Sequence, residues 1–294
     1  MPIRKDRLAL VIIFIILAGV VLGYLSQEGT TAQKNTGKIG VVVSIAPEVE
    51  FVKAVGGDKV DVTLMVPPTA DVHTYEPLPN QLSKVAGAQM YVMVGSGVEF
   101  ENNYLDKIRS TNPSMLVVNA SQGIQLIPSS EEDEGGMMDS HVWTSPRNAK
   151  IMVENIYKGL VEVDPDNMNY YKENRDEYLA KLDELDSKTT ELLKDKTKPI
   201  LIFHPAFGYY ARDYNLTMIS VMVNDEEPSP QRIAMMVDTA LENNITVVYL
   251  QPQYDSKYMD SIAAQIGGQV LLVSDLDENY LENMHDVAVA FSKS

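Results

Sequence analysis

The feature that most constrains the fold is a repeated alternation between short apolar runs and helix-length segments. The runs are rich in β-branched residues and have strand length, and glycine or proline ends many of them. We expect strands at Lys38–Ser44, Val60–Val66, Met90–Val94, Met115–Val118, Ile200–Phe203, Met218–Met222, Thr246–Leu250 and Val270–Val273. We expect helices at Glu48–Val55, Gln81–Ala88, Tyr104–Ser110, Ser229–Glu242, Tyr258–Ile266 and Asn279–Ser292. This alternation predicts an α/β protein with mostly parallel sheets.

One segment in the middle of the chain breaks the alternation. Asp164 and Pro165 form a helix start signal, and neither glycine nor further proline follows until about Lys194. Apolar residues keep to one helical stripe there, namely Tyr171, Tyr178, Leu182, Leu185 and Leu192. A helix of roughly 30 residues is about 45 Å long, too long for an ordinary crossover. We therefore expect a rigid helix at 164–196 that joins an α/β lobe at 39–163 to a second α/β lobe at 197–294.

The N-terminus has the pattern of an export segment. Arg4, Lys5 and Arg7 precede an unbroken apolar run from Leu8 to Leu25, and a polar stretch at 26–38 follows. The positive flank favours a cytoplasmic start of the chain. We expect residues 1–25 to be a signal or anchor segment, residues 26–38 a tether, and the rest extracytoplasmic, either membrane-tethered or secreted.

Charge and cysteine content exclude several kinds of partner and site. The net charge is −17 and the pI is about 4.6, so a nucleic-acid partner, which requires a basic surface, is not expected. The chain has no cysteine, which excludes disulfides and thiolate metal sites. A metal site would have to use histidine and carboxylate side chains, with methionine as a further candidate ligand.

Three of the four histidines lie in similar surroundings. His73 follows the expected strand that ends at Val66, and His204 directly follows another strand. His141 lies in the stretch DSHVWTSP, after an acidic segment, and prolines are near all three. Ligands bind at the carboxyl ends of parallel strands, so a metal site is one interpretation, and three ordinary hydrogen-bonded histidines are the other. His285 lies inside an expected helix and has no such setting.

Several motifs, in order along the chain, resemble one known family. They are Gly56-Gly-Asp58, VPPTADVHTYEPLP, DSHVWTSP, FHPAFGYYARDY, EEPSP and QPQYDSK, and the similarity extends from about Ile39 to Ser292. The sequence resembles the metal-binding solute receptors of ABC importers for zinc and manganese, the ZnuA/TroA-like group. The resemblance implies two lobes joined by one long helix, with a metal site in the cleft between them.

The resemblance also implies a ligand set. His73 and His141 would come from the first lobe, and His204 and Asp275, in VSDLDENY, from the second. Glu76 and Asp139 are near enough in sequence to orient the imidazoles through hydrogen bonds. We expect Phe207, Tyr209 and Tyr210 to pack around the ligand, with ordinary core packing as the alternative. The family commonly has Glu where this chain has Gln251, so no charge is expected to act there.

Three imidazoles and one carboxylate suit Zn²⁺ in tetrahedral geometry, whereas Mn²⁺ prefers more oxygen ligands. Zinc members of the family often carry a histidine-rich loop where this chain has the acidic run Glu131–Glu134, so manganese stays open. That run could raise the cation concentration near the site or simply be a solvated loop.

We expect a monomeric receptor, not an enzyme, that delivers a divalent ion to the membrane permease of an ABC importer. A surface adhesin and a zinc hydrolase are the alternatives.

Overall fold

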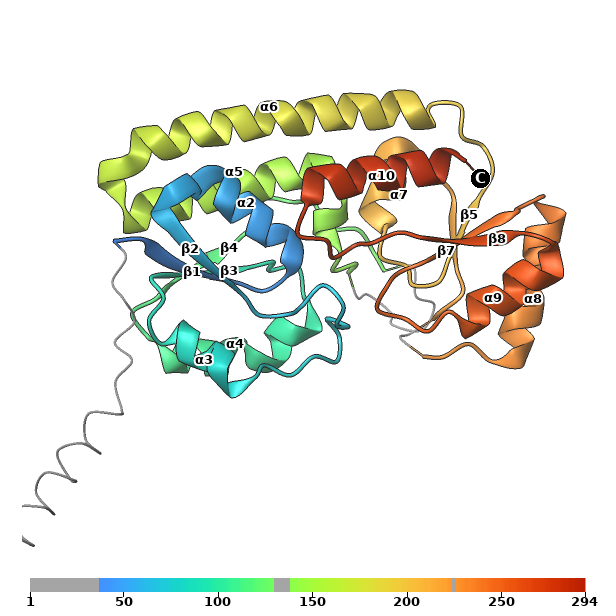
Figure 1. Cartoon of the computed structure of the whole chain (residues 1–294), viewed down its shortest axis with the longest axis horizontal. Helices are drawn as coiled ribbons and strands as arrows, with labels where there is room; N and C mark the ends of the chain where they lie inside the picture. Colours follow the sequence, from blue (N-terminus) through green and yellow to red (C-terminus); the bar gives the residue numbers. More distant parts are fainter. Residues whose placement is uncertain (1–36, 130–137, 224–225, 294) are drawn as a thin grey trace, which may run out of the picture. The chain divides into compact units, whose positions relative to one another are not determined.

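A computed structural model describes residues 37–129, 138–223 and 226–293. Residues 38–294 form one compact unit that contains two four-stranded parallel sheets (Figure 1). The α/β class, the two lobes and the long helix predicted from the sequence are therefore confirmed. The N-terminal export segment and the acidic run Glu131–Glu134 lie outside the described residues.

The sheet of the first lobe has the order β2-β1-β3-β4. Its strands are β1 (Ile39–Val43), β2 (Val60–Leu64), β3 (Met90–Met93) and β4 (Leu116–Asn119). The helices α2 (Ala46–Gly56) and α5 (Pro146–Val163) cover one face, and α3 (Pro79–Val85) and α4 (Glu99–Thr111) cover the other (Figure 1). Both central strands lie between helices, which is why their sequences are almost wholly apolar.

The second lobe repeats this strand order as β6-β5-β7-β8. Its strands are β5 (Ile200–Ile202), β6 (Met218–Ser220), β7 (Val247–Leu250) and β8 (Gln269–Leu272). The helices α8 (Pro230–Glu242) and α9 (Lys257–Ile266) cover one face, and α7 (Gly208–Tyr214) and α10 (Tyr280–Ser292) lie on the other (Figure 1). In both lobes the strands are parallel, so their carboxyl ends share one edge of each sheet.

The long helix begins slightly later than expected. A short 3-10 helix at Pro165–Asn167 precedes α6, which covers Met168–Leu193. It packs against α5 and α2 of the first lobe and against α10 of the second. The expected apolar stripe is correct except at its end, where Leu193 is buried and Leu192 is 40% exposed. The buried positions advance by four residues from Leu185 to Thr189 to Leu193, which leaves Leu192 outside the stripe.

The helices α5 and α7 were not expected from the sequence, and α4 begins earlier than expected. The helix α5 begins with a Ser145 N-cap, whose hydroxyl accepts from the Asn148 N–H, and with proline at its first position. Gly159 in its last turns weakens the sequence signal. The helix α4 begins at Glu99 instead of Tyr104, and this extra turn brings an acidic side chain to the site.

Among the residues that the structure describes, no helix is both long enough and apolar enough to cross a membrane.

Candidate metal centre

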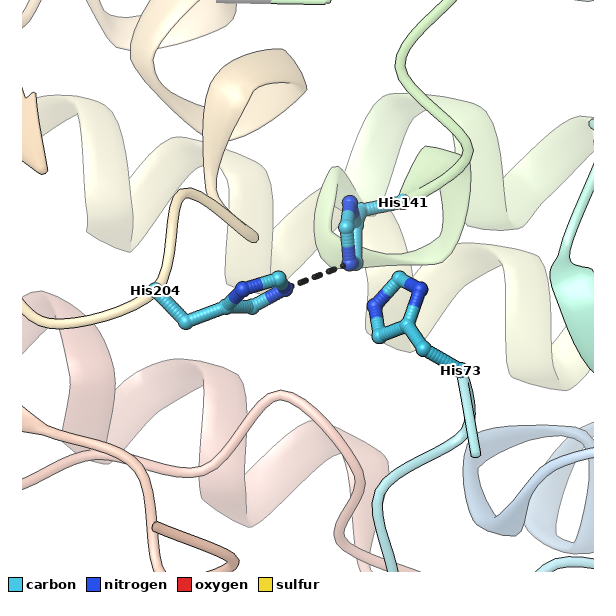
Figure 2. Close-up of side chains that lie close together, drawn as sticks. All are labelled: His73, His141 and His204. Carbon is cyan, nitrogen blue, oxygen red and sulfur yellow. Dashed lines mark hydrogen bonds between the residues drawn. The ribbon is translucent and has the colours of Figure 1, made fainter. Parts of the chain in front are cut away.

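Three histidines converge at the carboxyl edge of the two sheets. His73 lies in the loop after β2, His204 follows β5, and His141 directly precedes the 3-10 helix Val142–Thr144 (Figure 2). One ligand nitrogen from each ring lies within 4.8 Å of the others. The ring centroids are 5.6 Å apart for His73 and His141, 5.2 Å for His73 and His204, and 5.0 Å for His141 and His204. Residues more than 130 positions apart thus form one cluster with the geometry of a metal site.

Two carboxylates fix the rings of the first-lobe histidines. The Nδ1 of His73 is 2.7 Å from Oε2 of Glu99, and the Nδ1 of His141 is 2.9 Å from Oδ1 of Asp139. A carboxylate accepts, so each Nδ1 carries the proton and Nε2 is the nitrogen that would bind an ion. The Asp139 carboxylate also accepts from the backbone N–H of His141, at 2.8 Å. Asp139 therefore sets both the backbone and the ring of His141.

The surroundings of His204 favour a neutral imidazole. His204 is 2% exposed, and burial, followed by the charges of His141 and His73, lowers its pKa well below the usual value. Its Nε2 is 3.1 Å from Nε2 of His141 (Figure 2), a distance at which two protonated nitrogens would repel. Burial acts to raise the pKa of Glu99, but the hydrogen bond and charge of His73 outweigh it and the pKa is lowered. An uncharged imidazole next to a carboxylate partner is the form that binds a metal ion.

The structure places Asp275 beside this cluster but outside it. Asp275 lies in the loop after β8 and is 1% exposed. Burial raises its pKa, while the charge of His141 and the hydrogen bond from Gln253 act to lower it. Within the described residues, no carboxylate joins the three histidines in the 4.8 Å group. Asp275 Oδ1 accepts from Nε2 of Gln253, at 2.9 Å, and its backbone oxygen accepts from Nε1 of Trp143, at 2.7 Å.

The structure puts a carboxylate other than Glu76 on the ring of His73. Glu76 is exposed in the loop after His73, whereas Glu99, at the start of α4, makes the bond to the His73 ring. Sequence proximity suggested Glu76, but α4 follows β3 at the same sheet edge and reaches the ring from another direction. An acidic residue just after the neighbouring strand is the signal that could have identified Glu99.

The aromatic residues are distributed differently from the expectation. Phe207 and Tyr210 are fully buried and pack against Phe291 of α10, which is ordinary core packing. Tyr209 does contribute to the site, because its hydroxyl donates to the backbone oxygen of Asp139 at 2.7 Å. The rings that lie beside the histidines are those of Trp143, 5.2 Å from His141, and Tyr254, 5.3 Å from His204.

His285 lies on α10, as the sequence indicated, and lines a small surface cavity with residues of α6 such as Lys181 and Glu184. It has no part in the three-histidine cluster.

Comparisons with known proteins agree with this geometry. A family model described as zinc-uptake complex component A, periplasmic (ZnuA), matches residues 41–294. The high-affinity zinc uptake system protein ZnuA of Bacillus subtilis (strain 168) is 33% identical over 274 residues, which cover 87% of this chain and 83% of that protein. The zinc-binding protein AdcA of Streptococcus pyogenes serotype M6 is 30% identical over 262 residues, and the match covers 82% of this chain but only 51% of AdcA.

Solved structures show the same fold. A crystal structure of ZnuA has a TM-score of 0.83 and 37% identity, and the match covers 87% of this chain and 99% of that one. The periplasmic zinc-binding protein TroA of Treponema pallidum has a TM-score of 0.78 at 18% identity, and the match covers 87% of this chain and 99% of that one. At this identity the similarity shows the fold alone. Zinc is bound in the structure of a ZnuA deletion mutant, and manganese in a periplasmic metal-binding protein of Candidatus Liberibacter asiaticus. Members of this family are transport components and not enzymes, so the zinc hydrolase alternative is rejected. This chain belongs to the ZnuA family of zinc-uptake components.

Proposed function

We propose that this chain is an extracytoplasmic receptor that binds one divalent metal ion, zinc in preference to manganese, and delivers it to the permease of an ABC importer. The observation that carries the proposal is the convergence of His73, His141 and His204 from both lobes into one group of ligand nitrogens within 4.8 Å. His73, His141, His204 and Asp275 form the proposed ligand set. In this proposal the two lobes are residues 39–163 and 197–294, and the helical region 164–196 joins them. The receptor acts as a monomer.

The chemistry of the donors favours zinc. Three neutral imidazoles are borderline nitrogen ligands, which suit Zn²⁺ better than Mn²⁺, and one carboxylate would complete a tetrahedral site. The carboxylates of Glu99 and Asp139 hold two of the rings in place before an ion arrives. The ion therefore meets ligands that are already oriented, and little ordering free energy is lost on binding.

The similarity of the chain to zinc-uptake and zinc-binding proteins supports the cargo and the route. The B. subtilis relative is described as a high-affinity zinc uptake protein, and the AdcA relatives as zinc-binding proteins, in S. pneumoniae as a zinc-binding lipoprotein. Two of these matches cover only about half of the relative's length. The extracytoplasmic location and an anchor or signal at residues 1–25 belong to the same proposal.

The test is metal binding by the purified full chain, stripped of metal and titrated with Zn²⁺ and Mn²⁺ in competition with a chelator. One tightly bound zinc ion per chain is the expected result. A preference for manganese would contradict zinc as the transported ion but would still support the receptor function. If neither ion bound at a stoichiometric ratio, the receptor function itself would be contradicted. Metal uptake by cells that lack the importer permease would then test delivery, since uptake by this route should be lost.

A further inference from the structure

Two glutamines in the loop after β7 contact the two proposed ligands of the second lobe. Gln251 follows the last residue of β7 and is fully buried, and Gln253 comes two residues later. Gln251 contacts the backbone of His204, and Gln253 contacts the carboxylate of Asp275. One short loop thus controls the position of both ligands.

Gln251 continues the β5–β7 pairing beyond the ends of the strands. The N–H of Phe203 donates to the backbone oxygen of Tyr249 at 2.9 Å. At the next position, the N–H of His204 donates to Oε1 of Gln251 at 3.2 Å, and Nε2 of Gln251 donates to the backbone oxygen of His204 at 2.7 Å. A neutral amide can accept and donate at once in this way, whereas an ionised carboxylate can only accept. The backbone of His204 is therefore held on both sides by one side chain, in a region where an unmade hydrogen bond is costly.

Gln253 acts on a ligand atom itself. Its Nε2 is 2.9 Å from Oδ1 of Asp275, while the backbone oxygen of Asp275 accepts from Trp143. The side chain is buried, and the hydrogen bond from Gln253 restricts the rotation of its carboxylate. Of its two oxygens, Oδ1 is the one that Gln253 holds.

We infer that Gln251 and Gln253 are positioning residues, and that Gln253 sets the metal preference by keeping Asp275 to one coordinating oxygen. The inference rests on the proposed function. Three imidazole nitrogens and one carboxylate oxygen give the four ligands of a tetrahedral zinc site. Mn²⁺ prefers more oxygen ligands and would gain from a carboxylate that binds through both oxygens. A hydrogen bond on Oδ1 opposes that second contact and so disfavours manganese.

The two glutamines give a matched pair of tests. Gln251→Leu removes the support of the His204 backbone, which serves either ion, so the affinities for Zn²⁺ and Mn²⁺ should fall together by about 10–100-fold. Gln253→Leu removes the bond to Oδ1, so the ratio of zinc to manganese affinity should fall by about tenfold. Gln265→Leu, at an exposed glutamine of α9, is the control and should leave both affinities unchanged.

The measurements are chelator competition with both ions on the full chain and X-ray absorption at the zinc edge. The expected spectroscopic change is an increase in the number of nitrogen and oxygen neighbours of zinc in Gln253→Leu only. Gln253→Met, which keeps the length of the side chain, gives the same comparison if Gln253→Leu does not fold. If Gln253→Leu changed neither the ratio of zinc to manganese affinity nor the number of neighbours of zinc, the inference would be overturned. The proposed receptor function would not be affected. A wild-type chain that binds neither ion would overturn both.

Discussion

At the scale of single residues, the site is a set of side chains whose roles depend on their partners. His73 and His141 each have a carboxylate on Nδ1, and His204 is held through its backbone. His285 differs from these three histidines, because it lines a cavity between α6 and α10. The same imidazole chemistry therefore has different consequences at the four positions.

The first prediction concerns these two classes of histidine. His204→Ala removes one of three converging nitrogens and should weaken zinc binding by at least about 100-fold, because a tetrahedral site loses a ligand. His285→Ala should change zinc affinity by less than about twofold, since its ring is outside the cluster. Chelator competition measures both. Equal losses in the two variants would show that the ligand assignment is wrong.

A buried carboxyl in the first lobe gives a prediction about pH. Oε2 of Glu48 accepts from the N–H groups of Ser44 and Ile45, at 3.0 and 3.2 Å, and the side chain is fully buried. Burial, and then the charge of Glu101, raise the pKa of Glu48 well above its usual value. The folded protein therefore holds a proton that the unfolded chain releases above about pH 4.3, so this contribution to stability is complete below that pH and is lost as the pH rises.

Glu48→Gln cannot ionise, so its free energy of unfolding should decrease less than that of the wild type between pH 5 and pH 8. The wild type should therefore lose more of its free energy of unfolding than Glu48→Gln over this range. Urea unfolding of the metal-stripped protein at both pH values measures it. Parallel pH dependence in the two proteins would contradict a raised pKa.

At the scale of secondary-structure elements, α5 and α6 show what packing adds to helix propensity. Both helices carry an apolar stripe, but α5 also approaches the first sheet closely enough to require a glycine. A Cβ on Gly159 would lie 2.5 Å from Cγ2 of Val118 and 2.9 Å from Sδ of Met90. Val118 is short and β-branched on β4, so it has little freedom to move away.

The prediction for this element opposes the usual effect of the substitution. Glycine to alanine in an exposed helix stabilises by about 1 kcal/mol. Gly159→Ala should instead destabilise the protein by about 1–3 kcal/mol, because the added methyl group overpacks the interface between α5 and the sheet. Urea unfolding measures the change, with Lys158→Ala at the exposed neighbour as the control, expected within about 0.5 kcal/mol of the wild type. A stabilised Gly159→Ala would mean that the helix can shift at no cost.

At the scale of the whole molecule, the two lobes are linked around the site by more than the long helix. Trp143 of the first lobe donates to the backbone of Asp275, and Tyr280 of α10 donates to the backbone oxygen of Trp143 at 2.8 Å. Ser145, at the start of α5, bonds to Asp213 of α7. The histidines therefore belong to a hydrogen-bonded interface between the lobes.

Metal binding should stabilise this interface as a unit. An ion that binds only the folded state adds about 2.7 kcal/mol at a free concentration 100 times its dissociation constant. The midpoint of thermal unfolding should accordingly rise with Zn²⁺ and stay unchanged in His204→Ala. Trp143 is the only tryptophan, and its ring is 5.2 Å from His141, so its fluorescence reports both zinc binding and unfolding. A fluorescence change without a shift in the midpoint would mean that zinc binds the folded and the unfolded chain equally well.

The sequence by itself determined all the strands, most of the helices and the candidate ligands, but not α5 or α7. The alternation of apolar runs, the uninterrupted helix near Met168–Leu193 and the strand-end positions of His73 and His204 are local patterns, and backbone geometry turns local patterns into strands, helices and loops. Asp139 could also be identified in this way, because it lies two residues from the ring that it orients.

Only the tertiary structure decided which side chains support those ligands. Glu99 is 26 residues from His73, Gln251 is 47 residues from His204, and Trp143 is 132 residues from Asp275. It also decided that Gly159 is required and that Phe207 and Tyr210 belong to the core. Such contacts depend on how the strand ends of two sheets and the helices around them come together in space. No periodicity or spacing along the chain specifies that arrangement, because the contacts form between elements that packing, and not sequence order, brings side by side.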